Sequence, residues 1–405
     1  MITFEAIDAG HGDALLVRYM GSMGYERIIL VDAGPSSTGK HNGNKYDPLT
    51  AAILPRLAEV KQQRDANGDD IKAGEELLTL DLVVCTHVHD DHILGVTGLY
   101  GGLSKNTALP AGAEIISAPR LWHNSFSKLV EGIDIGAATE REAEALAIGD
   151  GINLTAFAGK IGTVVNEGAP GNLIAAGQQP KGFGPAAITI LNPGKKELEE
   201  LKDDWEKYAK KLKSPDAAQL ADAVEEAELF KEDNSVLNLS SIVMLVEFKG
   251  RRILLTGDQR GDYVLRSLKA LGLKQADKPF HVDLMKVPHH GSKANVQKKF
   301  IAGVTADIYV FSANGKDQNP DPEVLEIVAA EAKKGRRFTM AFTHEVMNYV
   351  PLDGVLPSFV DGPQVATLAQ AISHLKKDPD IAANVTFEFR KPGAHSLVYQ
   401  FPQKT

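Results

Sequence analysis

The sequence predicts an α+β protein built on a sandwich of β-sheets. Short apolar segments with the length of buried strands alternate with segments of helical spacing. Several of these predicted strands end at a histidine or an aspartate, as expected when strand ends share one edge of a sandwich. The 405 residues suffice for one large core, so we expect a single domain over residues 1–405, with an insert over 102–235 and a C-terminal extension over 351–405.

The first hundred residues contain four predicted strands and one predicted helix. The strands cover residues 2–7, 14–19, 27–31 and 80–85, and glycine-containing turns at 8–13 and 21–24 separate the first three. Residues 49–63 have helical spacing and should pack on the sheet. Residues 36–48 and 61–76 are polar and should form a surface loop and a charged connector.

The middle of the chain carries weaker signals. We expect strands at 113–117 and 186–193 and a short helix at 139–148. Residues 195–213 and 217–231 are rich in charge and have helical spacing. They predict a solvated helical hairpin, with a lid over the site as the alternative.

Clear patterns return at residue 237. Strands at 237–248 and 253–258 predict a hairpin, and further strands are expected at 282–287, 306–312 and 338–342. Residues 263–271 and 322–334 predict helices. The last two strands, 385–389 and 396–401, flank a proline-glycine turn and predict a terminal hairpin.

Composition and charge limit the possible functions. The chain is 43% hydrophobic and 24% charged, with a net charge of −9, which argues against broad electrostatic binding of duplex nucleic acid. A local basic groove or a metal centre can still bind phosphate. The one cysteine, Cys85, lies in an apolar segment and is expected in the core. Because neither a signal peptide nor an apolar run of roughly 18 residues is present, we expect a cytoplasmic protein without membrane contact.

Residues 86–92 carry the densest chemical signal, directly after the strand at 80–85. Three of the chain's 12 histidines lie within these seven positions. In an extended segment His87 and His89 face the same way, and a turn after His89 brings Asp91 and His92 to a second point nearby. Imidazole and carboxylate groups bind Zn²⁺, Mn²⁺ or Fe²⁺. We therefore predict a metal site here rather than a solvated loop.

Other predicted strands also end in polar residues that can bind metal or support a ligand. We expect Asp32 to hydrogen-bond a metal-bound histidine or its loop. Asp258 is suited to bridge two cations because a carboxylate has two oxygens. His11 and Asp13 lie in a glycine-rich turn and can line the same rim, with a plain turn residue as the alternative for His11. The remaining residues of this kind are His289, His290, Asn314 and His344.

The pattern His87-x-His89-x-Asp91-His92 resembles the signature of the metallo-β-lactamase superfamily. This resemblance implies a four-layer αβ/βα sandwich with a helical insert and a C-terminal hairpin. It also implies one or two metal ions, Zn²⁺ or Mn²⁺, at one edge of the sandwich.

The resemblance also implies which residues bind which ion. His87 and His89 would bind the first cation, whereas Asp91, His92 and a late histidine would bind the second. Asp258 would be shared by both. Either His289 or His290 can be the late ligand; we favour His290, which leaves His289 near the substrate.

Residues 2–100 and 236–335 further resemble the competence-type domains attached to bacterial DNA-uptake channels. The segments at 8–14, 238–241, 255–258, 287–292 and 312–325 carry this likeness. It implies a metal-dependent nuclease or phosphodiesterase. The chain departs from the pattern at His11, where the branch has glutamine, and at Asn319 and Asp321, where it tends to have histidine. Where many family enzymes have a third histidine for the first metal, this chain has Asn238, Ser240 and Ser241.

We expect a hydrolase that uses a metal-activated water, with a phosphodiester as substrate. Asp91 would accept a proton, and His289 or His11 would give one to the leaving group. A hydrolase of carboxylic esters, lactones or thioesters is one alternative. A non-catalytic metal-binding module, with a protein partner in a larger assembly, is another. Residues expected to contact the substrate or support the ligands are Asn238, Ser241, Ser292, Lys293 and Asn314.

Overall fold

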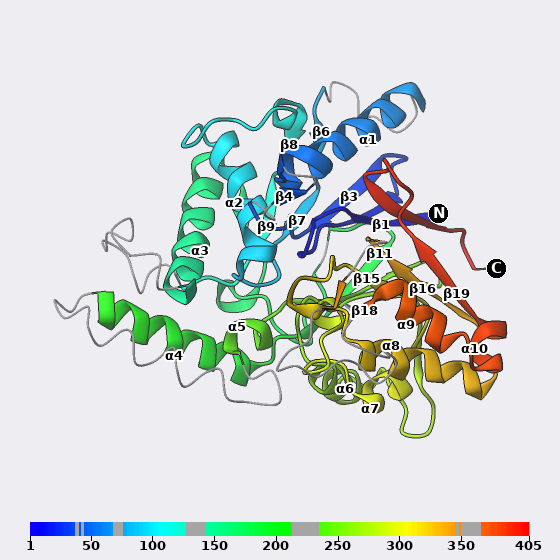
Figure 1. The fold of residues 1–405 in the computed structure, drawn as a ribbon. Coiled ribbons are helices and arrows are strands. Elements are labelled where there is room, and N and C mark those ends of the chain that lie inside the picture. Colours follow the sequence, from blue (N-terminus) through cyan, green and yellow to red (C-terminus); the bar gives the residue numbers. More distant parts are fainter. Residues whose placement is uncertain are drawn as a thin grey trace.

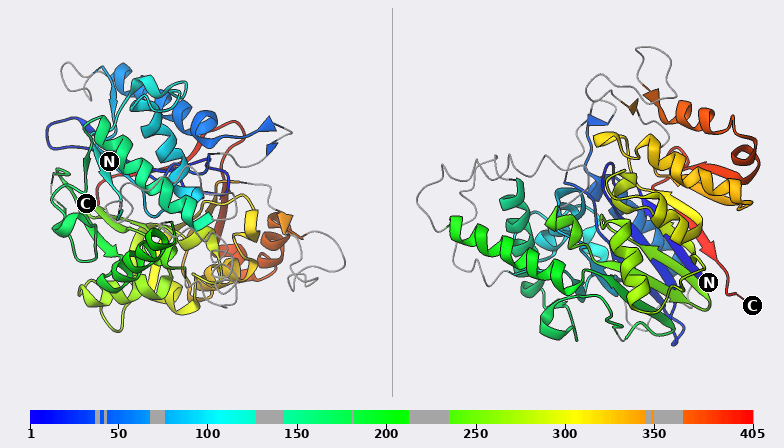
Figure 2. Two further views of the ribbon diagram at one scale, coloured as in Figure 1. Left: turned by 90° about the vertical axis from the view of Figure 1, so that its left-hand side faces the viewer. Right: turned by 90° about the horizontal axis from the view of Figure 1, so that it is seen from below.

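Two seven-stranded sheets pack face to face, and helices cover the outer face of each (Figures 1 and 2). The first sheet has the order β10-β9-β7-β3-β2-β1-β20, and the second has the order β11-β12-β13-β14-β15-β16-β19. The computed structural model describes residues 1–36, 40–41, 44–67, 76–126, 143–180, 182–212, 235–344, 348–349 and 366–404. The predicted α+β sandwich with four layers is confirmed.

The strands of the two main sheets come from both halves of the chain. The first sheet contains β1 (Ile2–Ile7), β2 (Leu15–Met20), β3 (Glu26–Val31), β7 (Leu82–Val84), β9 (Arg120–Trp122), β10 (Val164–Val165) and β20 (Ser396–Phe401). The second sheet contains β11 (Ala186–Asn192), β12 (Val243–Phe248), β13 (Arg251–Leu255), β14 (Phe280–Lys286), β15 (Val304–Phe311), β16 (Phe338–Phe342) and β19 (Val385–Phe389).

Shorter strands form three separate two-stranded pairs. They are β4 (Lys40–His41) with β5 (Asn44–Lys45), β6 (Leu78–Thr79) with β8 (Ile116–Ser117), and β17 (Asn348–Tyr349) with β18 (Ala366–Thr367). The helices are α1 (Leu54–Asn67), α2 (Asp90–Leu103), α3 (Ala143–Lys160), α4 (Lys195–Leu212), α5 (Val236–Leu239), α6 (Gly261–Ala270), α7 (Lys298–Gly303), α8 (Pro322–Ala329), α9 (Leu368–Leu375) and α10 (Pro379–Asn384).

Alternation along the strands divides the core into three apolar layers. In β12, Met244 and Val246 lie between the two sheets, whereas Leu245 faces the helices of the second half. In β1, Phe4 lies between the sheets. The opposite side of β1 carries Glu5, which is buried against α1. Each sheet therefore has one face on its partner and one face on helices, which is the physical basis of the four layers.

The predicted terminal hairpin is wrong. Strand β19 pairs in parallel with β16 in the second sheet, whereas β20 pairs antiparallel with β1 in the first sheet. The turn between them thus crosses from one sheet to the other. An isolated two-stranded hairpin is marginal in water, and each strand instead extends the edge of a large sheet. The C-terminal residues are part of both sheets.

Several other elements differ from the prediction. The strand expected at 237–248 begins only at Val243, because residues 236–239 form α5, and the side-chain oxygen of Ser235 accepts the N–H of Asn238. The strand expected at 113–117 is reduced to β8. Helix α3 extends to Lys160, well beyond the predicted 148. Residues 139–142 and the helix predicted at 217–231 lie outside the described residues.

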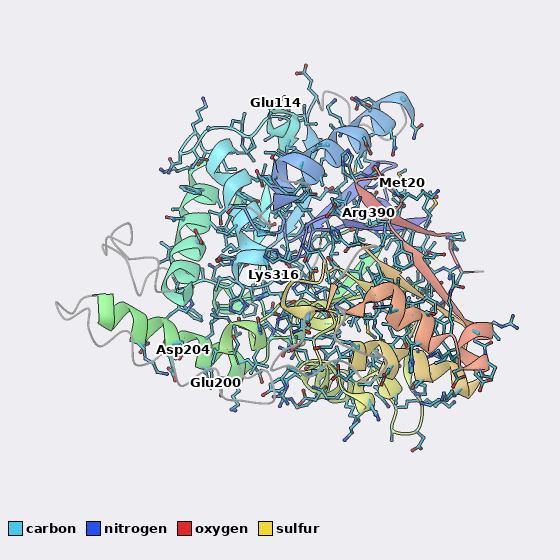
Figure 3. The ribbon with its side chains drawn as sticks, in the orientation of Figure 1. Met20, Glu114, Glu200, Asp204, Lys316 and Arg390 are labelled. Atoms are coloured by element: carbon cyan, nitrogen blue, oxygen red, sulfur yellow. The ribbon has the colours of Figure 1, made fainter. Side chains whose placement is uncertain are left out.

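Helix α4 has one buried and one solvated face. Leu201 and Trp205 are buried in the core around α2 and α3, whereas Glu200 and Asp204 point outward along the flank of the molecule (Figure 3). Whether this region acts as a lid stays a prediction. Within the described part of the chain, every helix is too short or too polar to cross a membrane.

Candidate metal centre

The strand ends that the sequence singles out lie at one edge of the sandwich. Strands β3 and β7 run parallel in the first sheet, and β13, β14 and β15 run parallel in the second. Their carboxyl ends therefore share an edge in each sheet. The segment after β7 turns sharply because α2 begins at Asp90, and two aspartates in its first turn interact favourably with the helix N-terminus.

Asp91, His92, Asp258 and His290 converge on one point. The Nε2 atom of His290 lies 3.1 Å from Oδ2 of Asp91 and 3.4 Å from Oδ2 of Asp258. The Nε2 atom of His92 lies 3.2 Å from Oδ2 of Asp258 and 3.8 Å from Oδ2 of Asp91. Ligand atoms of a tetrahedral Zn²⁺ lie about 3.3–3.6 Å apart. The four side chains thus have the spacing of a coordination shell.

Three of these ligand atoms are buried without a hydrogen-bond partner among the described residues: Nε2 of His92, Oδ2 of Asp258 and Nε2 of His290. Buried polar atoms without a partner are rare and costly. They face one another, so a single bound cation would satisfy all three. The residues present therefore fit a divalent metal ion.

His87 and His89 lie next to each other beside this cluster. The Nε2 atom of His87 lies 3.2 Å from Nδ1 of His89 and 4.0 Å from Oδ2 of Asp258. The region where many family enzymes have a third histidine holds Ser241 instead. Its Oγ lies 3.4 Å from Nδ1 of His87 and accepts the backbone N–H of Asp258 at 3.2 Å. Ser241 thus supports two residues of the centre through hydrogen bonds.

Hydrogen bonds on the far side of the rings fix which nitrogen faces the centre. His92 donates from Nδ1 to Oδ2 of Asp32 at 2.8 Å, and His290 donates from Nδ1 to the carbonyl of Ser312 at 2.8 Å. Each ring therefore presents its Nε2 toward Asp258. Asp32 also accepts the backbone N–H and the hydroxyl of Thr86, each at 2.7 Å. Asp32 thus contacts both a predicted ligand and its loop, as the sequence suggested.

Lys286 is a part of the centre that the sequence analysis missed. Its ammonium is fully buried, 2.5 Å from Oδ2 of Asp13 and 3.4 Å from Oδ1 of Asp258. These carboxylates outweigh the effect of burial and raise its pKa. Because Oδ1 of Asp258 faces Lys286, only Oδ2 faces the histidines. A lysine directly after the apolar pair Leu284-Met285, at the end of a predicted strand, was the available signal.

The carboxylates and imidazoles of the centre strongly shift one another's pKa values. Burial acts to raise the pKa of Asp91 and of Asp258, but the facing imidazoles outweigh it and hold both pKa values well below the usual range. Burial also acts to lower the pKa of His290, and the carboxylates reverse this and raise it to about 10. His87 differs, because burial and the neighbouring His92 hold its pKa well below the usual range. A cation would take the place of protons on the imidazoles.

The residues expected at the rim of the site make contacts of different kinds. His11 lies beside Lys316, with 3.1 Å between Nε2 and Nζ, and Figure 3 shows Lys316 where the α2 side meets the loops of the second half. Lys293 is exposed and pairs with Glu323 at 3.3 Å. Ser292 and Asn314 accept backbone N–H groups within their own turns. These contacts give Lys293, Ser292 and Asn314 local roles, and no described contact joins them to the four converging side chains.

Two further histidines lie apart from the cluster. His344 contacts Oδ1 of Asp8 at 2.8 Å, and Arg390 contacts the other oxygen of the same carboxylate at 2.7 Å. His123 is buried, with its Nε2 3.3 Å from the carbonyl of Gly151. Both side chains have structural contacts. Cys85 is buried in the core, as expected.

The sequence matches the family model described as "Metallo-beta-lactamase superfamily" over residues 8–313. A search of curated proteins finds no match. Among solved structures, a mutant of the CmlA beta-hydroxylase is 15% identical with a TM-score of 0.39, covering 99% of this chain but only 54% of that one, so the chain spans about half of that protein.

Two other solved structures match along almost their whole length. The metallo-beta-lactamase fold protein YhfI from Bacillus subtilis is 10% identical, with coverages of 98% and 99% and a TM-score of 0.35. Zn²⁺-bound PqqB from Methylobacterium extorquens is 12% identical, with coverages of 99% and 100% and a TM-score of 0.36. The family match covers about three quarters of the chain and includes the His87–His92 segment and Asp258. The chain therefore belongs to the metallo-β-lactamase superfamily.

Proposed function

We propose that the chain is a metal-dependent hydrolase that acts on phosphodiesters, with Zn²⁺ or Mn²⁺ as its metal. Members of the superfamily are typically metal-dependent hydrolases, and the fold usually binds one or two divalent ions. The observation that carries the proposal is the convergence of buried, unpartnered ligand atoms from Asp258, His92 and His290 on one point.

Charge favours an anionic substrate. Four carboxylates lie in or beside the centre, on Asp13, Asp32, Asp91 and Asp258, against the one ammonium of Lys286. This excess of negative charge attracts divalent cations. Two such ions would reverse its sign and leave one net positive charge, which attracts a phosphodiester anion more than a neutral ester.

A divalent cation held by these residues supplies Lewis-acid chemistry, lowering the pKa of water to roughly 7 and polarising the substrate. Asp91 would be one of the side chains that hold the cation. Because the pKa of Asp91 lies well below its usual range, this carboxylate suits ligation better than proton acceptance. At the rim, the pair formed by His11 and Lys316 is the proposed source of the leaving group's proton.

A turnover assay tests the proposal. The chain is stripped with a chelator and reloaded with Zn²⁺ or Mn²⁺, and release of nitrophenol from bis(4-nitrophenyl) phosphate is compared with release from 4-nitrophenyl acetate. We expect metal-dependent turnover of the phosphodiester and its loss in Asp258→Asn. The matched control is Asp307→Asn, because Asp307 is an exposed aspartate outside the centre.

Other results would redirect the assignment. Metal-dependent turnover of the acetate ester alone would favour the alternative hydrolase of carboxylic esters, lactones or thioesters. Tight metal binding without turnover of either substrate would favour a non-catalytic module in a larger assembly. Phosphodiester turnover that Asp258→Asn leaves unchanged would contradict the proposed site.

A further inference from the structure

Helices α6 and α7 lie side by side on the outer face of the second sheet (Figure 1), with a cavity of about 380 Å³ between them. Its lining includes Arg260, Leu265, Arg266, Lys269, Lys299 and Phe300. We infer that this α6–α7 groove binds the backbone of a single-stranded nucleic acid whose scissile phosphodiester lies at the metal centre. The inference rests on the proposed function and deepens it by naming the substrate class.

Positive charge gathers around the groove. Lys269, near the end of α6, and Lys299, near the start of α7, have exposed side chains. In the part of the chain that the structure describes, no carboxylate pairs with either ammonium. Two arginines lie beside them, each with one carboxylate nearby. The groove therefore keeps the charge of both lysines and attracts anions locally, although the net charge of the chain is −9.

The two arginines are held in place by a shared aromatic ring. The guanidinium carbon of Arg260 lies 5.3 Å from the centre of the Tyr263 ring, and that of Arg266 lies 4.2 Å from it. Asp262 accepts from Nε of Arg260 at 3.0 Å. Glu197 accepts from Nη2 of Arg266 at 2.7 Å. Planar guanidinium groups that are already oriented suit the binding of phosphate oxygens and stacking on bases.

The floor of the groove is apolar. Leu265 and Phe300 are 5% and 1% exposed and belong to the core between the second sheet and its helices. A nucleotide joins a charged phosphate to a flat base with an apolar face, so it matches cations around an apolar floor. An acidic peptide brings the charge without the flat ring. The lining therefore favours a nucleic acid over an acidic peptide.

The groove begins beside the metal centre. Arg260 follows Asp258 by two residues, which an extended chain spans in about 7 Å. The side chain of Asn295 donates to the carbonyl of Asp258 at 2.8 Å, and its own carbonyl accepts the N–H of Gly261 at 2.8 Å. The amide oxygen of Asn295 lies 2.9 Å from Nδ1 of His289, whose Nε2 lies 3.5 Å from Oδ2 of Asp258. Asn295 thus fixes the start of α6 to the centre.

The length of the groove suits several phosphates of one strand. Lys269 lies nine residues after Arg260. Because an α-helix rises about 1.5 Å per residue, the cations extend over about 13 Å. One strand of a duplex carries a phosphate for about every 3.4 Å of axis. A strand that leaves the metal centre can therefore place more than one phosphate along α6, whereas the cavity is too small for a duplex.

Strand binding is measured on the metal-free chain, so that the result does not depend on turnover. With chelator present, fluorescence anisotropy follows a labelled oligothymidylate of about 12 nucleotides over a range of salt concentrations. The variant is Lys269→Gln/Lys299→Gln. The matched control is Lys298→Gln/Lys391→Gln, which removes two exposed lysines outside the groove and changes the net charge equally.

We expect the wild-type chain and the control to bind the strand with affinities within about twofold of each other. The groove variant should bind at least about tenfold more weakly. Each phosphate contact of a single strand contributes about 0.7 to the slope of log affinity against log salt, so the slope should flatten by about 1.4.

Three results would overturn the inference: no strand binding by the wild-type chain, equal affinities of the groove variant and the control, or competition by a polyglutamate peptide as strong as that by unlabelled strand. Failure of the proposed function appears separately, as absence of metal-dependent turnover of bis(4-nitrophenyl) phosphate. The two failures are therefore distinguishable.

Discussion

Replacing Lys286 by methionine should destabilise the metal-free chain much more than the metal-loaded chain. Methionine nearly matches the volume of lysine but removes the one buried ammonium among the carboxylates of the centre. In the metal-free protein, Asp13 and Asp258 would then keep only the facing imidazoles as compensating groups. When cations are bound, part of that compensation remains.

The magnitude follows from the distances. At an effective dielectric constant of about 20, a charge pair 2.5 Å apart attracts by about 7 kcal/mol and one 3.4 Å apart by about 5 kcal/mol, before desolvation is counted. Desolvation offsets much of this, and removing one partner of a buried ion pair costs roughly 3–5 kcal/mol. We therefore expect Lys286→Met to lower the free energy of unfolding of the metal-free chain by about that amount.

Urea unfolding, followed by circular dichroism with chelator or with excess Zn²⁺, measures both states. The loss in the metal-loaded state should be smaller by at least about 1.4 kcal/mol, which corresponds to tenfold tighter cation binding by the variant. The control Lys293→Met removes an exposed pair and should cost less than about 1 kcal/mol in either state. Equal losses in both states, or a loss below about 1 kcal/mol without metal, would refute this reasoning.

Three further predictions concern other parts of the molecule. Burial acts to raise the pKa of Glu5, but Arg56 and Arg18 outweigh it and lower that pKa. The stabilisation from Glu5 is therefore present above the unfolded-state pKa of about 4.3 and is lost as pH falls through the folded value. Thermal melts of Glu5→Gln should show a smaller acid-induced drop in melting temperature than the wild type, and an equal drop would contradict this. Gly12→Ala would place a Cβ 2.0 Å from the carbonyl oxygen of Asp91, so dialysis should show weakened metal binding, whereas unchanged binding would contradict the packing described. Chelation should lower the melting midpoint of the wild type, and calorimetry showing no shift would indicate that the centre binds no ion.

Much of the site was predictable because its residues follow strands whose ends must share an edge. Alternation after β7 brings His87 and His89 together, and the helix that begins at Asp90 redirects Asp91 and His92. These are local effects, so the spacing of the residues along the sequence is enough to predict them. The pairing of Asp32 with this loop was also accessible, since a carboxylate at a buried strand end needs a donor or cation.

The parts that could not be predicted depend on contacts between distant segments. Strands 385–389 and 396–401 have the local pattern of a hairpin. Each of them pairs instead with a strand of a different sheet, β16 or β1. Lys286 is the last residue of β14, and its role depends on Asp13 from the opposite half of the chain. The choice between His289 and His290 likewise depends on left-handed backbone angles and on Asn295, which no residue pattern reveals.

The most direct measurement is an anomalous difference map from crystals of the metal-loaded chain, recorded at the absorption edge of the bound metal. The account predicts a peak bonded to Asp91, His92, Asp258 and His290, and a second ion would lie beside His87 and His89. A map with no peak at this edge of the sandwich, in crystals that bind the metal elsewhere, would contradict it.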